Sequence, residues 1–179
     1  IGYGFAGRCF HSYLIGLAPG LELRGIASRR AETRDKIRAE RACHAYESFE
    51  QVLADGEVDL VVLATPNSTH CEMACAALEA GKHVVTDKVM CLNTAEADRM
   101  IDTASRTGRM LSVFQNRRWD GDYLTVRQLI DEGKIGKVRR IEMAWVSFGM
   151  WGGWRGQRAM GGGKLYDLGA HLLDQLCQV

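Results

Sequence analysis

The sequence has few features that would place it outside the ordinary globular proteins. Only two of its 179 residues are proline, and neither a low-complexity segment nor an internal repeat is visible. Because no run of about 18 apolar residues occurs, the sequence predicts no membrane span. The formal net charge is only +1, and the arginines do not alternate with aromatic residues. This balance argues against a general affinity for nucleic acid or membrane surfaces.

Cysteines with the C-x-x-C spacing are also absent. The six cysteines therefore predict reduced thiols in a cytoplasmic protein rather than a disulfide framework. Cys71 and Cys75 lie one helical turn apart beside His70, which is compatible with a metal site. Two thiols without a second pair are weak support for a metal. We therefore favour packing inside a helix and predict no metal.

Strand and helix patterns alternate from the start of the chain to about residue 115. Residues 60–64 form a continuous aliphatic run, which is typical of a parallel strand buried on both faces. The alternation predicts an α/β fold with a Rossmann-type, doubly wound parallel sheet. We assign residues 1–115 to a dinucleotide-binding domain of this kind.

Residues 116–179 follow a different pattern. A helix is predicted over 123–132, one longer strand over 138–148, a glycine-rich loop over 149–163 and a last helix after it. This region should begin an α+β substrate domain. The glycine turn at the start has almost no strand before it, and residues 172–179 show no helix-stop signal. We therefore expect sequence to be missing at both ends and most of the second domain to lie outside this chain.

The segment G-Y-G-F-A-G over residues 2–7 has the spacing of a pyrophosphate-binding loop. Gly2 allows a tight turn, Gly4 allows the backbone to approach the phosphates, and Gly7 allows close packing of helix and strand. Phe5 and Ala6 lie in the same loop and should also line the cofactor. The motif opens a helix and precedes a strand, as dinucleotide binding requires. The alternative is a glycine-rich turn with no ligand.

The residues after the second predicted strand indicate which dinucleotide binds. An NAD site usually carries Asp or Glu there, but this chain has Ser28, Arg29 and Arg30. Two arginines at a helix start oppose the helix dipole unless an anion lies nearby, and a ribose 2′-phosphate would be such an anion. We therefore favour NADP(H), with NAD possible. The alternative is a solvated arginine pair.

Two further strand ends should face the same crevice. After the run at 60–64, we expect cofactor contacts from four polar or turn residues: Thr65, Pro66, Asn67 and His70. Turn and helix-cap chemistry is the alternative, and both roles are compatible. Lys88 follows the next strand, where it can bond a substrate hydroxyl and contact the cofactor.

The last helix carries Asp167, His171 and Asp174 on one face. A carboxylate one turn from a histidine can orient the imidazole and raise its basicity, which makes His171 a candidate base. The alternative is an exposed polar face, opposite a buried face of Leu168, Leu172 and Leu176. Other candidates for a polyol or nicotinamide pocket are Asn116, Arg117, Trp154 and Arg155.

Taken in order, these motifs resemble the glucose–fructose oxidoreductase, inositol dehydrogenase and MocA family. The resemblance rests on G-Y-G-F-A-G, A-T-P-N-S-T-H (64–70), Asp87-Lys88, F-Q-N-R-R-W-D (114–120) and G-G-G-K-L-Y-D-L-G-A-H-L-L-D-Q (161–175). Among the branches of this family, the sequence most resembles that of the NADP-dependent scyllo-inositol dehydrogenases. The resemblance implies a two-domain enzyme with a mainly antiparallel second sheet, which commonly forms dimers or tetramers.

The resemblance also implies a catalytic set, which corresponds here to Lys88, Asp167 and His171. One departure concerns Lys88, because the family usually reads Glu-Lys-Pro and this chain reads Asp87-Lys88-Val89. The bond before that proline is often cis, and a cis bond before valine costs about 2.5–4 kcal/mol. Either the bond is trans here and Lys88 is displaced, or the site holds strain.

Three functional hypotheses follow. The first is an NADP(H)-dependent oxidoreductase that transfers a hydride between nicotinamide and a secondary alcohol or ketone of a sugar or cyclitol. The second, suggested by the missing proline, is a module that senses NADP(H) without turnover. The third is an NAD-dependent glycosidase of the same fold, against which the arginine pair argues mildly.

Overall fold

The computed structural model describes residues 1–149 and 151–179 and divides into two compact units, Ile1–Val113 and Phe114–Val179. Each unit is described by itself. Across the described residues, no helix has both the length and the apolar character needed to cross a bilayer.

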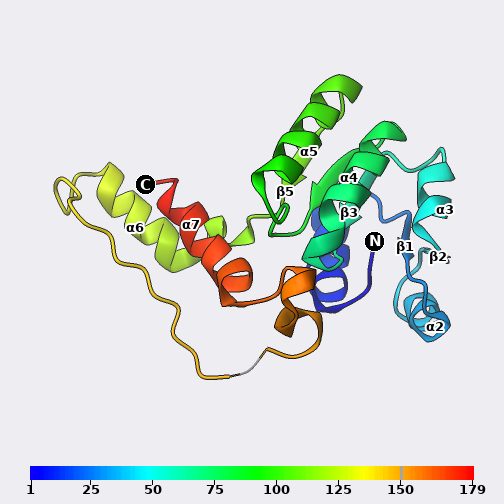
Figure 1. Ribbon diagram of the computed structural model, residues 1–179, viewed down its shortest axis with the longest axis horizontal. Helices are drawn as coiled ribbons and strands as arrows, with labels where there is room; N and C mark the ends of the chain where they lie inside the picture. The colour runs from blue at the N-terminus through cyan, green and yellow to red at the C-terminus, as the bar shows by residue number, and fades with distance from the viewer. Residues whose placement is uncertain (150) are drawn as a thin grey trace. The chain divides into compact units, whose positions relative to one another are not determined.

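The first unit contains five short parallel strands in two sheets (Figure 1). β1 (Gly25–Ala27) pairs with β2 (His44–Tyr46), and Ile26 lies opposite Ala45. β3 (Leu60–Leu63), β4 (His83–Thr86) and β5 (Leu111–Val113) follow in that order in the second sheet. This is the parallel α/β architecture that the alternating pattern predicts.

The N-terminal residues join the two sheets through backbone hydrogen bonds. The Gly2 N–H donates to the Ala27 carbonyl at 3.1 Å, at the end of β1. The Ala64 N–H donates to the Ile1 carbonyl at 2.9 Å, just beyond β3. Residues 1 and 2 therefore lie between the carboxyl ends of β1 and β3, and this placement positions the glycine turn that follows.

Helices connect the strands of the first unit. The first begins as a π-helical turn, η1 (Gly7–His11), and continues as α1 (Ser12–Leu17). The others are α2 (Ala31–Glu40), α3 (Phe49–Ala54), α4 (His70–Glu79) after the 3₁₀ turn η2 (Asn67–Thr69), and α5 (Thr94–Thr107). The α5 ends follow common capping rules: Asn93 accepts from the Glu96 N–H, and Gly108 takes the left-handed conformation at φ 64°.

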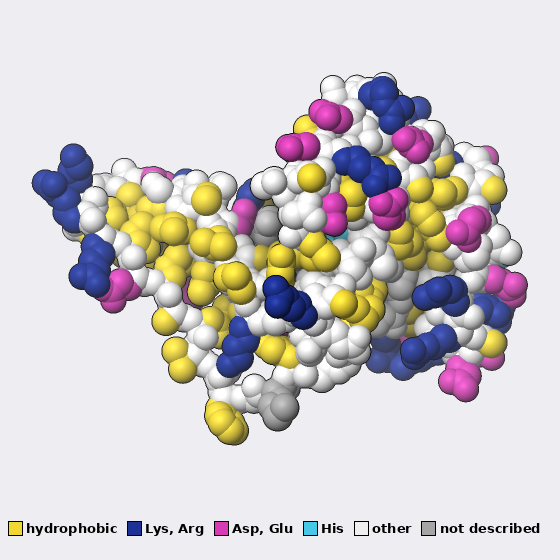
Figure 2. All heavy atoms as spheres, in the orientation of Figure 1, with side chains coloured by type: hydrophobic (Ala, Val, Ile, Leu, Met, Phe, Trp, Pro, Cys, Tyr) yellow, Lys and Arg dark blue, Asp and Glu magenta, His cyan; other side chains and the backbone are white. Residues whose placement is uncertain are grey.

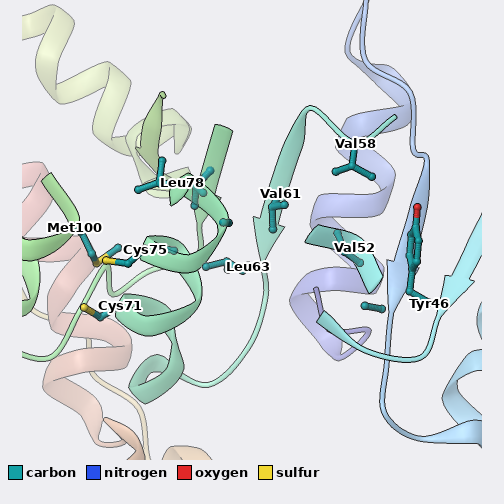
Figure 3. Close-up of a cluster of buried hydrophobic side chains, with 13 residues drawn as sticks. Tyr46, Val52, Val58, Val61, Leu63, Cys71, Cys75, Leu78 and Met100 are labelled. Carbon is teal, nitrogen blue, oxygen red and sulfur yellow. The ribbon is translucent and has the colours of Figure 1, made fainter. Parts of the chain in front are cut away.

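The main hydrophobic core lies on both sides of β3 (Figure 3). Leu63 packs among Cys71, Cys75 and Leu78 of α4, with Met100 of α5 behind them. The opposite side holds Val52 and Val58 together with Tyr46 of β2. Burial on both sides explains why residues 60–63 are aliphatic without a polar alternation.

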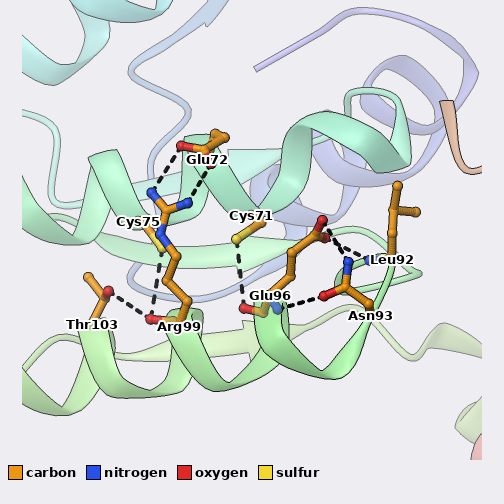
Figure 4. Close-up of polar contacts among 8 residues, drawn as sticks. All are labelled: Cys71, Glu72, Cys75, Leu92, Asn93, Glu96, Arg99 and Thr103. Atoms are coloured by element: carbon orange, nitrogen blue, oxygen red, sulfur yellow. Dashed lines mark hydrogen bonds and ion pairs between the residues drawn. The ribbon is translucent and has the colours of Figure 1, made fainter. Parts of the chain in front are cut away.

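The two cysteines of α4 pack as the helix interpretation predicts (Figure 4). The Cys71 thiol donates to the Glu96 carbonyl at 3.7 Å, and the Cys75 thiol contacts the Arg99 carbonyl at 4.0 Å. Within the described part of the chain, no cluster of three potential metal ligands is found. The outer surface of α4 and α5 is mixed in charge, with Arg99 paired to Glu72 (Figures 2 and 4).

The second unit contains η3 (Asn116–Trp119), α6 (Gly121–Asp131), two 3₁₀ turns (Gly153–Gly156 and Arg158–Met160) and a C-terminal helix. The strand predicted over 138–148 is wrong, because this segment is extended but pairs with no other strand among the described residues. A strand needs hydrogen-bonding neighbours in addition to alternating side chains. The alternating apolar side chains are only partly covered, with Ile141, Met143 and Trp145 41%, 36% and 39% exposed.

The C-terminal helix also differs from its predicted faces. It begins as a π-helical turn, η6 (Leu165–Gly169), and continues as α7 (Ala170–Leu176). Its buried side chains are His171 and Gln175, whereas Leu176 is 43% exposed. Leu168 and Leu172 are half-buried, so the leucine face expected to be buried is covered only in part. The alternative of an exposed polar face is therefore wrong for His171, whereas its role as a base stays a prediction.

Candidate functional site

The glycine turn contains two glycines that the packing of the protein requires and one that it does not require. A Cβ on Gly2, whose φ is +91°, would lie 2.6 Å from the Ala64 carbonyl oxygen. A Cβ on Gly7 would lie 2.2 Å from the Gly2 carbonyl oxygen. A Cβ on Gly4 would meet no protein atom within 4 Å. Gly4 therefore faces open space at the helix start, which fits a cradle for a dinucleotide pyrophosphate.

The segment after β1 exposes the two arginines beside this turn. Arg29 and Arg30 are exposed, while the guanidinium of Arg34 is only 14% exposed. Arg34 donates to the carbonyls of Ser28 at 3.0 Å and Arg29 at 3.1 Å. The partly buried Arg34 side chain thus fixes the backbone of the turn, and the two arginines expected to contact a phosphate extend from it. The Ser28 hydroxyl accepts from the Arg30 N–H at 3.3 Å.

The turn after β3 is held by hydrogen bonds among its own residues. The Thr69 hydroxyl donates to the Thr65 hydroxyl at 2.7 Å and also contacts the Pro66 carbonyl at 2.8 Å. Asn67 is 3% exposed and begins η2. The turn chemistry expected for these residues is present, but no side-chain cap is found at the start of η2 or α4. Cofactor contact from Thr65, Pro66, Asn67 and His70 stays a prediction.

Lys88 follows β4, which lies beside β3 in the same sheet. The Asp87 N–H donates to the Leu63 carbonyl at 2.9 Å, so the residues after β3 and β4 leave the sheet at the same edge. The Lys88–Val89 peptide bond is cis, and the alternative of a trans bond is wrong. Lys88 thus lies at the edge that also carries the glycine turn, as its position after a strand predicts.

The second unit gathers several of the predicted site residues around His171, which is 5% exposed. Its ring lies 6.2 Å from the ring of Trp145, and the Arg117 guanidinium lies 4.8 Å from the same indole. The side chain of Gln175 donates to the Arg117 carbonyl at 2.7 Å. The backbone of Arg117 is therefore bonded to the last helix, and its role in a substrate pocket stays a prediction. Arg118 binds both carboxylate oxygens of Asp174, which makes Asp174 an anchor of α7.

A second group lies one helical turn earlier. The Arg155 guanidinium forms an ion pair with Asp167 at 3.6 Å and covers the ring of Trp154 at 4.7 Å. Asp167 is 14% exposed. Trp154 and Arg155 of the loop thus lie together with Asp167 of the last helix, and their roles in a pocket stay predictions. The role of Asp167 in orienting His171 stays a prediction.

Three side chains at these sites escape the sequence analysis. His11 approaches Asp87, Arg34 binds the Ser28–Arg29 backbone, and Trp145 joins Arg117 to His171. A lone histidine or tryptophan carries no spacing signal. The only available hint was for Arg34, which lies one helical turn after Arg30 on a helix expected to be solvated.

Comparison with known proteins agrees with this geometry. A family model described as an oxidoreductase family with an NAD-binding Rossmann fold matches residues 1–115, and a GFO/IDH/MocA C-terminal domain model matches residues 123–179. The chain belongs to the Gfo/Idh/MocA family of oxidoreductases. The family's Rossmann fold and NAD-binding region are those expected from the glycine turn.

Members of the Gfo/Idh/MocA family similar to this chain come from diverse organisms. The uncharacterized oxidoreductase YdgJ of Escherichia coli is 43% identical, with 98% of this chain and 51% of YdgJ covered. The scyllo-inositol 2-dehydrogenase (NADP(+)) IolW of Bacillus subtilis is 34% identical, with 98% and 49% covered. The solved structure of an NAD-binding protein from Listeria innocua matches with a TM-score of 0.88 at 41% identity, covering 98% and 52%. The chain thus spans about half the length of these relatives.

Proposed function

We propose that this chain is the cofactor-binding part of an NADP(H)-dependent oxidoreductase. The reaction is hydride transfer between nicotinamide and a secondary alcohol or ketone of a sugar or cyclitol. The observation that carries the NADP(H) preference is the exposed pair Arg29 and Arg30 on a turn fixed by Arg34. None of residues 28–30 is Asp or Glu, whose carboxylate would repel a 2′-phosphate. The name of IolW supports both the cofactor and the cyclitol class.

The residues of the glycine turn would hold the pyrophosphate, with Gly4 leaving room for it and the start of the first helix supplying N–H donors. Arg29 and Arg30 would bind the 2′-phosphate through charge-assisted hydrogen bonds. When bound, the nicotinamide supplies the hydride chemistry. The protein's part is to orient the alcohol carbon and to manage the hydroxyl proton.

We assign the transfer of the substrate hydroxyl proton to Lys88, Asp167 and His171. His171 takes the hydroxyl proton as general base, and Lys88 hydrogen-bonds the same oxygen. Asp167 orients His171. The burial of His171 against Trp145 supports this assignment, because a ring held by packing has a defined direction from which to accept the proton.

A side-by-side fluorescence titration of the complete protein with NADPH and NADH tests the cofactor assignment. Hydrogen bonds to a charged group contribute about 1.5–3 kcal/mol, so NADPH should bind about ten- to a hundredfold more tightly than NADH. The variant Arg29→Gln/Arg30→Gln should lose this preference and still bind NADH. Arg38→Gln, on an exposed arginine of α2 that pairs with Asp35, is the matched control and should keep it. Equal binding of the two cofactors by the wild type would refute the 2′-phosphate argument.

A further inference from the structure

The backbone around Lys88 is held from two directions by two histidines that the proposed mechanism does not use. The residue before Lys88 contacts His11, and the residue after it contacts His70. Both histidines are buried, with relative exposures of 7% and 0%. A buried polar side chain normally has a hydrogen-bond partner, so it is expected that these histidines have partners. The identity of the partners indicates what each histidine holds in place.

His11 acts on the amino-terminal side of Lys88. Its Nε2 lies 3.3 Å from Asp87 Oδ2, and the other carboxylate oxygen accepts the Lys88 backbone N–H at 2.7 Å. Burial alone would raise the pKa of Asp87, but the hydrogen bonds and charges of His11 and Lys88 together outweigh it, and the pKa lies below its ordinary value. Asp87 is therefore a carboxylate at neutral pH that bridges the His11 ring to the main chain of Lys88.

His70 acts on the carboxyl-terminal side. Its Nδ1 lies 2.7 Å from the Val89 carbonyl oxygen, and its Nε2 lies 3.0 Å from the Thr65 carbonyl oxygen. A carbonyl oxygen only accepts and a neutral imidazole carries one N–H, so the ring donates to one of these two carbonyls, and the contact with Val89 is the shorter. The same ring thus ties the segment after Lys88 to the turn that follows β3.

We propose that His11 and His70 are positioning residues that fix the Lys88 backbone against the two loops assigned to the cofactor. His11 lies on the helix that begins in the glycine turn, and the His70 ring contacts the Thr65 carbonyl in the turn after β3. Each histidine therefore connects Lys88 to a different loop of the nucleotide site. The inference rests on the proposed function, because it assigns the histidines to the placement of a catalytic lysine.

Variants of His11 test one side of this arrangement in the complete protein. His11→Phe keeps a ring but removes the donor to Asp87, and His11→Gln can present an amide N–H near the Nε2 position. A displacement of about 1 Å at a catalytic group costs up to about 100-fold in rate. We expect His11→Phe to lower kcat about 10- to 100-fold, with the Kd for NADPH within about threefold of wild type. His11→Gln should restore most of the kcat.

Variants of His70 separate its two contacts. Asn places its amide nitrogen as many bonds from Cβ as Nδ1, and Gln does the same for Nε2. We therefore expect His70→Asn to keep most of the kcat and His70→Gln to lose it, since the contact with Val89 bears on Lys88. His44→Gln, on an exposed histidine whose ring meets that of Tyr46 edge to face, is the control and should behave as wild type. A folded His11→Phe variant with unchanged kcat would overturn the proposal, as would equal losses in His70→Asn and His70→Gln.

A measurement without turnover distinguishes this proposal from the proposed function. Reductive ¹³C-methylation labels Lys88 for NMR, and the resonance is assigned by its loss in Lys88→Arg. The Lys88 signal should shift in His11→Phe and His70→Gln but stay in place in His44→Gln. If the wild type oxidises no polyol with NADP and these shifts occur, the proposed function fails and the two-histidine placement stands. An unchanged Lys88 signal in both variants would overturn the placement itself.

Discussion

The Cβ that Gly7 lacks would lie 2.2 Å from the carbonyl oxygen of Gly2, far inside the distance at which two such atoms meet. Gly7 is therefore required by the contact between the first helix and the N-terminal segment. Gly4, between them, has no such neighbour, since its missing Cβ would meet no protein atom within 4 Å. Two glycines of one motif thus have different roles: Gly7 allows the fold to pack, and Gly4 leaves space for a ligand.

This difference predicts opposite effects of the same substitution. Gly7→Ala should destabilise the protein, because either the Gly2 turn or the helix must move; overpacking of this kind typically costs about 1–3 kcal/mol. Gly4→Ala should leave the melting temperature nearly unchanged and weaken NADPH binding by crowding the pyrophosphate. Thermal unfolding and a cofactor titration on each variant check the pair. If Gly4→Ala binds NADPH as tightly as wild type, the pyrophosphate does not approach Gly4.

The buried ring of His171 leads to a second prediction. His171→Ala should remove most of kcat, since general-base catalysis contributes about 10²–10⁴-fold. The Kd for NADPH should stay nearly intact because the cofactor loops belong to the first unit. Steady-state kinetics with a polyol and NADP measure the effect, and His44→Ala provides the control on an exposed histidine. Near-normal turnover in a folded His171→Ala variant would end the assignment of the base.

The parts of the fold predicted from sequence are those specified by local patterns. The run at 60–63 forms β3 because aliphatic residues suit a strand buried on both sides, and Gly108 ends α5 because glycine accepts a left-handed conformation. The glycine turn was predictable for the same reason. Its spacing encodes a backbone geometry, and the structure places it between the ends of β1 and β3.

The parts that were not predicted depend on partners distant in sequence. The alternation over 138–148 indicates a strand, but a strand forms only where a neighbour pairs with it. The most buried side chains of the last helix are His171 and Gln175, because Gln175 is bonded to Arg117 and Tyr123, which lie more than 50 residues earlier. His11 and Asp87 are 76 residues apart, and no local rule connects them. Contacts of this kind require the fold to be known first.

The burial of the α4 cysteines predicts a difference in thiol reactivity. Burial and the neighbouring Cys75 raise the pKa of Cys71 to about 11, so almost no reactive thiolate is present near neutral pH. Cys9 and Cys177 are exposed. In a DTNB titration of the native 179-residue chain at pH 7.5, these two should react quickly, and Cys71 and Cys75 only after denaturant is added. Mass-spectrometric mapping of the modified peptides identifies them. Fast native labelling of Cys71 would contradict the packing of α4 on α5.

Asp55 provides a prediction about acid stability. It accepts hydrogen bonds from the Tyr46 hydroxyl at 2.5 Å, the Glu57 N–H at 2.9 Å and the Arg24 guanidinium at 3.3 Å. The Tyr46 hydrogen bond is the largest cause that lowers the pKa of Asp55 from 3.8 to about 2. A carboxyl whose pKa is lower in the folded state stabilises the protein above its unfolded pKa. This contribution is lost as the pH falls from about 4 through about 2.

Tyr46→Phe should therefore raise the pKa of Asp55 toward 3.8 and lower the free energy of unfolding by a constant amount above about pH 5. The difference between wild type and variant should shrink as the pH falls from about 4 to about 2, because protonated Asp55 no longer gains from the hydroxyl. Urea unfolding at several pH values, with a ¹³C NMR titration of the Asp55 carboxyl, measures both. Tyr13→Phe, on a tyrosine that is 58% exposed, controls for the loss of a hydroxyl. A difference between wild type and Tyr46→Phe that stays the same from pH 6 to pH 2.5 would show that Tyr46 acts on stability by packing and not through the charge of Asp55.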